Sequence, residues 1–384
     1  MDLKGACFKV TVEKLAYGGD GIARLGSQVV FVPRSAPKDV LLVRISSVEK
    51  HYLRAEPVTI IEPSPWRREP ACPRFGICGG CQLQHLRYEA QLAAKAEFIK
   101  EALRRIAHIE VNVPILYSEE FGYRSRAQFK IAYNPLRVGF YQSGTNEVCD
   151  IDYCYVLEPV LNQTLQELKQ STFHSNSTKV DVASGQDGKV VVKGMSSEED
   201  YVQRSVLGIT YRYCAGSFFQ VNSKLLEALV ATAVADFGGD LGVDLYAGVG
   251  LFSLQLARRF GKIIAAEVNP LAAKWAATNI ALNKLTNVDY RRMSAEKCLQ
   301  MLCRNCVRPD LLLLDPPRAG ASPKVVSSIL ALRPKHVVYV SCEPTTLARD
   351  LKVLLEKGYS LASITGIDLF PQSYHVETIA TLRA

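Results

Sequence analysis

A cysteine stands at the point where a buried strand ends. Cys342 follows Ser341 and residues 336–340, a run of β-branched and aromatic side chains typical of a strand. A second apolar run, residues 311–314, leads directly into Asp315. Because ligands of open α/β sheets bind beyond the carboxyl ends of the strands, the Cys342 thiol is placed to act as a nucleophile. A buried structural cysteine is the alternative interpretation.

A glycine-containing turn predicts a cofactor site. Residues 244–250 read Asp-Leu-Tyr-Ala-Gly-Val-Gly and lie between an expected strand and an expected helix. Ser253 stands where the dinucleotide fingerprint has its third glycine, which argues against a pyrophosphate. Glu267 ends the next expected strand and can accept hydrogen bonds from both ribose hydroxyls. The pattern favours S-adenosylmethionine, with Asp244 near its amino group; a nicotinamide cofactor or a plain α/β scaffold is the alternative.

A dense group of cysteines predicts a metal or iron–sulfur site. Cys72, Cys78 and Cys81 are close in sequence, and a site of four thiolates needs one more ligand. Cys149 and Cys154 are the nearest candidates downstream. Spacing alone does not distinguish zinc from an iron–sulfur cluster, and three unligated thiols in a loop are the alternative.

Composition limits the class of protein. The chain has 384 residues, enough for two or three domains, and its formal net charge of +8 is compatible with a nucleic-acid partner. The first residues have no apolar signal core, and no stretch approaches the ~18 apolar residues that a membrane span requires. We therefore expect a cytoplasmic protein without a membrane partner. Eleven cysteines then indicate metal, cluster or catalytic use rather than disulfides.

The chain divides into three parts. Residues 1–60 contain several short alternating strands, which predict a small β-barrel. Residues 61–213 form a second part, in which an amphipathic helix is expected at 88–107 and is predicted to pack on the C-terminal domain. From residue 214 to 384 strands and helices alternate, as in an α/β domain with a parallel sheet.

Finer features of the two later parts are also predicted. Residues 116–213 are expected to form strands and hairpins, with turn-rich loops at 171–178 and 184–188. The last two strands, 360–368 and 375–382, are expected to form an antiparallel pair at a sheet edge. Other expected strands and helices of the C-terminal domain lie at 243–246, 251–260, 263–267 and 270–283.

Several segments resemble the RNA 5-methyluridine methyltransferases. They are residues 216–222, 314–320, 340–350 and 375–378. Residues 1–60, with the stretch Tyr17 to Ala23, resemble a TRAM domain, an RNA-binding barrel. The resemblance implies an α/β Rossmann-like S-adenosylmethionine-dependent methyltransferase domain, an N-terminal TRAM (OB-like) β-barrel and a mixed, mainly β central domain.

The same resemblance implies roles for individual residues. Cys342 is the expected nucleophile and Glu377 the expected base. The expected cofactor-binding residues are Gln220, Tyr246, Glu267 and Asp315. The expected ligands of a [4Fe-4S] cluster, as in the RumA-type 23S rRNA (uracil-5-)-methyltransferases, are Cys72, Cys78, Cys81 and Cys154. Ser294 departs from the family, in which many members have an acid or an amide for adenine recognition.

The implied reaction explains why one thiol and one carboxylate are needed. C5 of uracil is a poor nucleophile, but addition of a thiolate to C6 produces an enolate with negative charge at C5. After methylation a base must remove the C5 proton so that the cysteine can be expelled. A nearby cation should lower the pKa of the thiol, and Arg318 and Arg349 are the candidates.

The expected partner is RNA, most simply 23S rRNA, with no obligate protein partner. The target uridine must be unstacked, and residues 66–68 and 121–126 combine aromatic and basic side chains suited to hold it. Two alternatives remain: a tRNA uracil-5-methyltransferase and a non-catalytic RNA-binding protein of the same fold.

Overall fold

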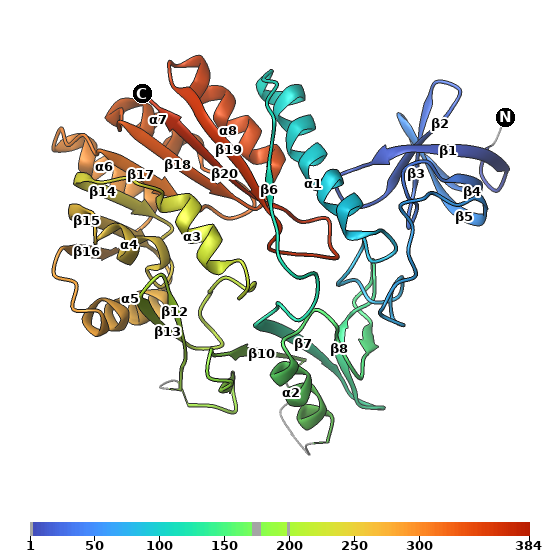
Figure 1. Ribbon diagram of the computed structural model, residues 1–384, viewed down its shortest axis with the longest axis horizontal. Coiled ribbons are helices and arrows are strands. Elements are labelled where there is room, and N and C mark those ends of the chain that lie inside the picture. The colour runs from blue at the N-terminus through green and yellow to red at the C-terminus, as the bar shows by residue number, and fades with distance from the viewer. Residues whose placement is uncertain (1–2, 171–177, 198–199) are drawn as a thin grey trace.

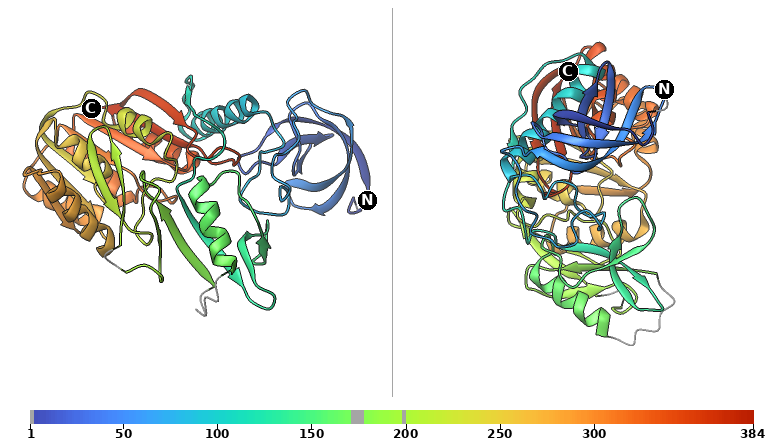
Figure 2. Two further views of the ribbon diagram at one scale, coloured as in Figure 1. Left: turned by 60° about the horizontal axis from the view of Figure 1, so that its bottom comes forward. Right: turned by 90° about the vertical axis from the view of Figure 1, so that its right-hand side faces the viewer.

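A computed structural model describes residues 3–170, 178–197 and 200–384. It has three parts, an N-terminal barrel, a central part and a C-terminal α/β domain (Figure 1). The barrel is set apart from the rest of the molecule and lies beside helix α1 (Figures 1 and 2).

The N-terminal barrel is closed and has the strand order β1-β2-β3-β5-β4. Its strands are β1 (Cys7–Leu15), β2 (Gly21–Leu25), β3 (Gln28–Val32), β4 (Val40–Val48) and β5 (Tyr52–Glu62). Side chains alternate between the interior and solvent, and Val12, Val30 and Leu53 are among those that fill the core. The predicted barrel is confirmed.

The central part contains a five-stranded antiparallel sheet of order β11-β10-β7-β8-β9. Its strands are β7 (Arg126–Ala132), β8 (Arg137–Tyr141), β9 (Val148–Asp150), β10 (Lys179–Ser184) and β11 (Val190–Val192). The expected mixed, mainly β central domain is confirmed, and helix α2 (Pro159–Gln170), which was not predicted, covers the sheet. Its apolar face, with Leu161, Leu165 and Leu168, has the spacing of a helix. The turn-rich loop expected at 171–178 lies outside the described residues except for Thr178.

The C-terminal domain is built on an eight-stranded sheet of order β16-β15-β14-β17-β18-β20-β19-β6. Its strands are β14 (Gly239–Leu245), β15 (Phe260–Glu267), β16 (Val288–Arg292), β17 (Leu311–Leu314), β18 (His336–Ser341), β19 (Ser360–Ile367), β20 (Glu377–Arg383) and β6 (Ile115–Leu116). Strands β14 to β18 are parallel, and β20 runs antiparallel to both of its neighbours. The expected antiparallel pairing of β19 and β20 is confirmed, but the two-residue strand β6 lies outside β19 and forms the edge of the sheet.

Helices cover both faces of this sheet (Figure 1). One face carries α3 (Leu226–Val234), α4 (Leu251–Leu256) and α5 (Pro270–Leu282). The other carries α6 (Ala295–Arg304), α7 (Pro323–Leu332) and α8 (Pro344–Glu356). The hairpin of β12 (Val202–Val206) and β13 (Ile209–Tyr213) packs into the core of the first face.

Helix α1 joins the central part to the C-terminal domain. It spans Tyr88–Ala102 and continues as a π-helical turn, Leu103–Ala107. Ile99 and Leu103 are buried in the same core as Leu347 and Leu351 of α8. In the described ranges, no helix has the length and apolar character needed to cross a membrane.

Candidate functional site

A cavity of about 660 Å³ lies beyond the carboxyl ends of the central strands of the C-terminal sheet. This is where an open α/β sheet binds its ligands. Six of the sequence-predicted catalytic and cofactor residues line this one cavity: Gln220, Tyr246, Glu267, Asp315, Cys342 and Glu377.

The cofactor side of the cavity is shaped by the turn after β14. Tyr246, with a φ of 62°, and Gly250, with a φ of 92°, adopt left-handed backbone conformations that fold the turn tightly. Glu267 at the end of β15 is held by this turn, because its carboxylate accepts hydrogen bonds from the amides of Gly248 at 3.1 Å and Val268 at 2.8 Å. One strand end and one turn therefore form a single rigid wall.

Asp244 lies beneath this wall and does not line the cavity. It is fully buried, and the Ser253 hydroxyl donates a hydrogen bond to its carboxylate. Burial raises the pKa of Asp244 to about 7, and the charge of Glu267 adds to the rise. The expected contact of Asp244 with the amino group of a cofactor is therefore wrong, and Ser253 has a structural role as its partner.

The reacting side of the cavity joins a thiol to two carboxyl groups, of which Glu377 is buried and Asp315 is partly buried. Cys342 follows β18, and Glu377, only 3% exposed, begins β20. Burial raises the pKa of Glu377 well above its usual range, and the nearby Asp315 raises it further. Burial also raises the pKa of the Cys342 thiol to about 11; the charges of Glu377 and Asp315 add to this, and Arg318 opposes it.

Arg318 and Arg349 differ in their placement. Arg318 lines the cavity, and its Nη2 donates a hydrogen bond to Nε2 of His375 at 3.1 Å. Arg349 does not line the cavity; its guanidinium binds the Asp350 carboxylate at 2.8 Å and the Ala319 carbonyl at 3.0 Å. The expectation that a cation lies near the thiol holds for Arg318 and is wrong for Arg349.

Phe218, Phe370 and His375 are among the further side chains that line the cavity and were not predicted to do so. Phe218, 62% exposed, belongs to a segment that the sequence had marked, two residues before Gln220. Phe370 and His375 come from the β19–β20 loop, residues 368–376. Ser294, in contrast, does not line the cavity and caps α6, where its hydroxyl accepts a hydrogen bond from the Lys297 amide at 3.3 Å.

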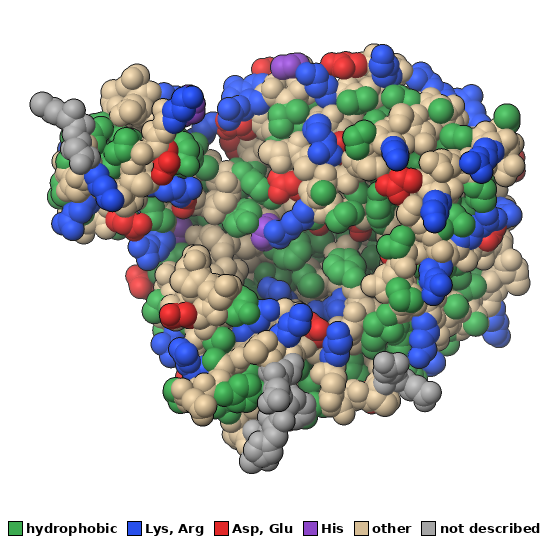
Figure 3. Space-filling view, turned by 180° about the vertical axis from the view of Figure 1, so that it is seen from behind, with side chains coloured by type: hydrophobic (Ala, Val, Ile, Leu, Met, Phe, Trp, Pro, Cys, Tyr) green, Lys and Arg blue, Asp and Glu red, His purple; other side chains and the backbone are tan. Residues whose placement is uncertain are grey.

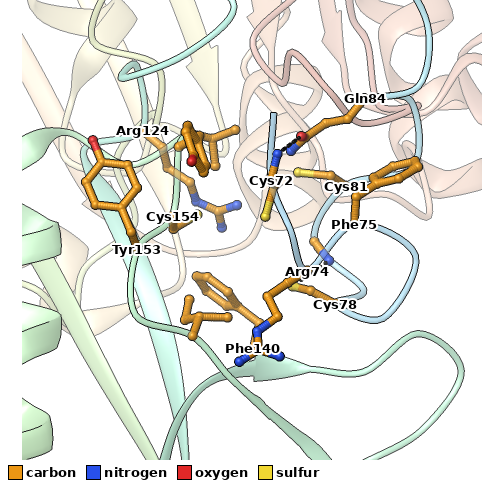
Figure 4. A pocket seen from close by; sticks show the side chains of 14 residues that line it. Cys72, Arg74, Phe75, Cys78, Cys81, Gln84, Arg124, Phe140, Tyr153 and Cys154 are labelled. Atoms are coloured by element: carbon orange, nitrogen blue, oxygen red, sulfur yellow. Dashed lines mark hydrogen bonds between the residues drawn. The ribbon is translucent and has the colours of Figure 1, made fainter. Parts of the chain in front are cut away.

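A second, much smaller cavity of about 40 Å³ is lined by four thiols (Figure 4). They are Cys72, Cys78, Cys81 and Cys154. Cys149 is buried nearby but does not line this cavity, so the geometry favours Cys154 as the fourth member of the group. Arg74 and Arg124 lie at the same cavity and can balance negative charge on thiolates (Figure 4).

The chemical state of these thiols is set by burial. All eleven cysteines are free, and burial raises the pKa of Cys78 to about 11 and that of Cys81 to about 12. Within the described ranges, no three histidine, cysteine, aspartate or glutamate side chains are grouped closely enough to hold a metal ion. A cluster of four iron and four sulfide ions is larger than one ion, so its thiolate ligands stand farther apart.

Comparison with known proteins adds to this geometry. The family model described as tRNA (Uracil-5-)-methyltransferase matches residues 136–384, and the TRAM domain model matches residues 3–58. An Aquifex aeolicus protein described as an uncharacterized RNA methyltransferase is 35% identical, with 99% of each chain covered. A Synechocystis protein of the same description is 32% identical, covering 99% of this chain and 96% of the relative.

A solved structure resembles the chain over its whole length. It is the tRNA (uracil-54, C5)-methyltransferase of Pyrococcus abyssi in complex with S-adenosyl-L-homocysteine, which is 26% identical. The similarity has a TM-score of 0.76 and covers 98% of this chain and 100% of the other. It therefore includes the barrel, the central part and the C-terminal domain.

Proposed function

Since the chain belongs to the tRNA (uracil-5-)-methyltransferase family and is an S-adenosylmethionine-dependent RNA methyltransferase, we propose that it methylates C5 of a uridine through covalent catalysis by Cys342 and Glu377. The observation that carries the proposal is the single cavity shared by these two residues and the four expected cofactor residues.

In this mechanism the Cys342 thiolate adds to C6 of uracil, and the electron pair of the C5–C6 double bond moves into an enolate. S-adenosylmethionine supplies the electrophilic methyl group that C5 then takes up, and S-adenosylhomocysteine remains. Glu377 removes the proton from C5, the double bond reforms, and the sulfur of Cys342 leaves C6 with its electron pair. Each catalytic residue thus has one task, and the thiolate is regenerated.

The electrostatics of the cavity suit a cationic methyl donor. Three carboxyl groups line it, those of Glu267, Asp315 and Glu377. The sulfonium and ammonium charges of S-adenosylmethionine would favour their ionised forms, as well as the thiolate of Cys342. We propose that Glu267 binds the ribose and that Gln220, Tyr246 and Asp315 complete the cofactor site.

The proposed substrate is 23S rRNA, on the combined resemblance of the barrel and the four cysteines to the RumA-type enzymes. A tRNA substrate is the second candidate, because the Pyrococcus abyssi enzyme of similar fold modifies tRNA. A non-catalytic role would leave the pairing of Cys342 and Glu377 in one cavity without a purpose.

The four thiols support a [4Fe-4S] cluster as a further proposal. Cys72, Cys78, Cys81 and Cys154 would hold it, and two arginines at the same cavity suit the net negative charge of such a centre. The methyl transfer itself requires no electron, so we propose a structural role that orients RNA. Anaerobic reconstitution followed by absorbance tests this, and a colourless protein with stoichiometric zinc would overturn it.

A surface beside the thiols can hold unstacked bases. The Arg68 guanidinium lies 5.8 Å from the centre of the Phe121 ring, and this ring lies 6.2 Å from Tyr155. Tyr155 in turn lies 5.1 Å from Tyr153, which is half exposed. Figure 3 shows a hollow near the centre of one face, with Lys and Arg side chains around it. We propose that the row from Arg68 to Tyr153, the aromatic row, contacts the RNA that flanks the target uridine.

The decisive experiment uses RNA that contains 5-fluorouridine together with S-adenosylmethionine. Fluorine at C5 cannot be removed by a base, so the wild-type protein should stay covalently bound to the RNA. Cys342→Ala should form no adduct, and the matched control Cys306→Ala, at an exposed cysteine, should form it normally. Adduct formation by Cys342→Ala would overturn the assignment. Mapping 5-methyluridine in rRNA and tRNA from cells with and without the protein distinguishes the two substrates.

A further inference from the structure

The turn between β1 and β2 of the barrel reaches the active site. It spans residues 16–20, and Gly18 and Gly19 have φ values of 118° and 98°. A Cβ atom on Gly19 would lie 3.0 Å from the Cβ of Gln82, so a glycine lets this turn rest against the loop that carries the cysteines. Tyr17 is the second residue of this turn.

The Tyr17 hydroxyl faces the segment that carries the nucleophile. Its oxygen lies 3.5 Å from the backbone carbonyl oxygen of Cys342, to which it can donate a hydrogen bond. Burial, together with the negative charge of the nearby Glu343 carboxylate, keeps the pKa of Tyr17 above its usual range. The hydroxyl is therefore a neutral donor. Glu343 in turn caps α8, where its side chain accepts a hydrogen bond from the Thr345 amide.

The Tyr17 ring faces the segment that carries the base. It packs edge-to-face on Tyr374, with ring centres 5.1 Å apart, and on Phe98 of α1, with centres 5.7 Å apart. Tyr374 lies in the β19–β20 loop, directly before His375 of the cavity wall and three residues before Glu377. One side chain of the barrel thus contacts both chain segments on which the proposed chemistry depends.

Further contacts around Tyr17 hold the barrel, the cysteine loop and the β19–β20 loop together. The amides of Gln82 and Leu83 both donate to the carbonyl of Gln372 at 2.9 Å, which ties the cysteine loop to the β19–β20 loop. Leu83 and Phe98 are buried in the same apolar cluster, against which Tyr17 and Tyr374 pack. A displacement of the barrel would therefore be transmitted to both catalytic segments.

We propose that Tyr17 is a positioning residue of the methyltransferase active site, through which the RNA-binding barrel sets the geometry of Cys342 and the β19–β20 loop. The inference rests on the proposed covalent mechanism. It makes the barrel a part of the active site as well as an RNA-binding module. Loss of the Tyr17 hydroxyl should slow the chemical step and leave the affinity for RNA intact.

The test compares Tyr17→Phe, which keeps the ring, with Tyr17→Ala, which removes it. The matched control is Tyr52→Phe, because Tyr52 packs within the barrel on Phe31. The full chain is assayed by the single-turnover rate of adduct formation on 5-fluorouridine RNA, with RNA affinity and melting temperature measured in parallel. Tyr17→Phe should lose about three- to tenfold in rate, the range expected for one hydrogen bond, with unchanged RNA affinity and melting temperature. Tyr17→Ala should lose more, and Tyr52→Phe nothing.

The outcomes separate the two proposals. Equal rates for the wild type and Tyr17→Phe would overturn the role of Tyr17 alone, as would a loss confined to RNA affinity or an equal loss in Tyr52→Phe. A wild-type protein that forms no adduct would overturn the covalent mechanism and the role of Tyr17 with it.

Discussion

Cys342 and Glu377 are brought together by the register of two antiparallel strands. Ser341, the residue before Cys342, pairs with Thr378, the residue after Glu377. Continued by one step, the same register sets Cys342 opposite Glu377 where β18 ends and β20 begins. Because β20 runs antiparallel to β18, it starts at the edge where the parallel strands of the sheet end, and its first residue brings a carboxyl group to the cavity.

Glu377→Gln should separate methyl transfer from release of the enzyme. The amide cannot take the C5 proton, so turnover should fall by about a hundredfold to ten-thousandfold, as for loss of a general base. The methylated covalent intermediate should then accumulate on ordinary uridine RNA. Denaturing electrophoresis of the protein with labelled RNA would detect it. The matched control is Glu356→Gln, at an exposed glutamate at the end of α8. Wild-type turnover by Glu377→Gln would exclude Glu377 as the base.

The ends of strands were predictable because apolar runs that stop at a polar residue are visible in the sequence. Glu267, Asp315 and Cys342 each stand at or directly after such a run, and all three line the cavity. Strand order was harder to predict. The residues of β20 are nearly all buried, which is typical of an interior strand, but a local pattern does not say which neighbours cover it.

The contact between the barrel and the active site escaped prediction. Tyr17 and Cys342 are 325 positions apart, and no periodicity links them. The prediction for Asp244 failed for another reason. Asp244 was expected to face a ligand, whereas it is buried within β14 and its carboxylate accepts a hydrogen bond from the Ser253 hydroxyl. The leucines of helix α2 do have helical spacing in the sequence. The helix was not predicted because the segments on both sides of it are strands.

The affinity for S-adenosylmethionine should depend more strongly on pH than the affinity for S-adenosylhomocysteine does. Burial raises the pKa of Asp315 to about 7, and a sulfonium cation nearby would lower it, so binding releases protons. The preference for the charged ligand should therefore grow as pH rises through about 7, by at most about tenfold per pH unit for one carboxyl group. Isothermal titration calorimetry in buffers of different ionisation enthalpy measures both the affinities and the protons released.

Asp315→Asn is the control for this dependence, since an amide does not titrate. The stability of the ligand-free protein should depend on pH in the opposite sense to the affinity for S-adenosylmethionine. With raised pKa values the folded state binds more protons than the unfolded state, so its free energy of unfolding should fall as pH rises through about 7. A ratio of the two affinities that is independent of pH in the wild type would contradict the assignment of these carboxyl groups to the cation.

Two neighbouring cysteines should differ in their effect on the proposed cluster. Cys154 lines the small cavity and Cys149 does not. After anaerobic reconstitution, Cys154→Ala should lose most of the iron and the visible absorbance, and Cys149→Ala should keep both. Because the two cysteines lie close together, the pair controls for general destabilisation of this part of the molecule. Equal loss in the two variants would count against the four-thiol assignment.

The aromatic row predicts a graded effect on RNA affinity. Tyr155 is the middle one of the three aromatic rings in this row, and it lies against both Phe121 and Tyr153. Tyr155→Ala should weaken RNA binding by about 1 kcal/mol, roughly fivefold, because stacking on a base contributes about that much or more. Tyr155→Phe, which keeps the ring face, should bind nearly as the wild type does. Fluorescence anisotropy with a short single-stranded RNA at fixed salt measures both. If Tyr155→Phe lost as much affinity as Tyr155→Ala, the hydroxyl rather than stacking would be the contact, and the row would not act as a platform for bases.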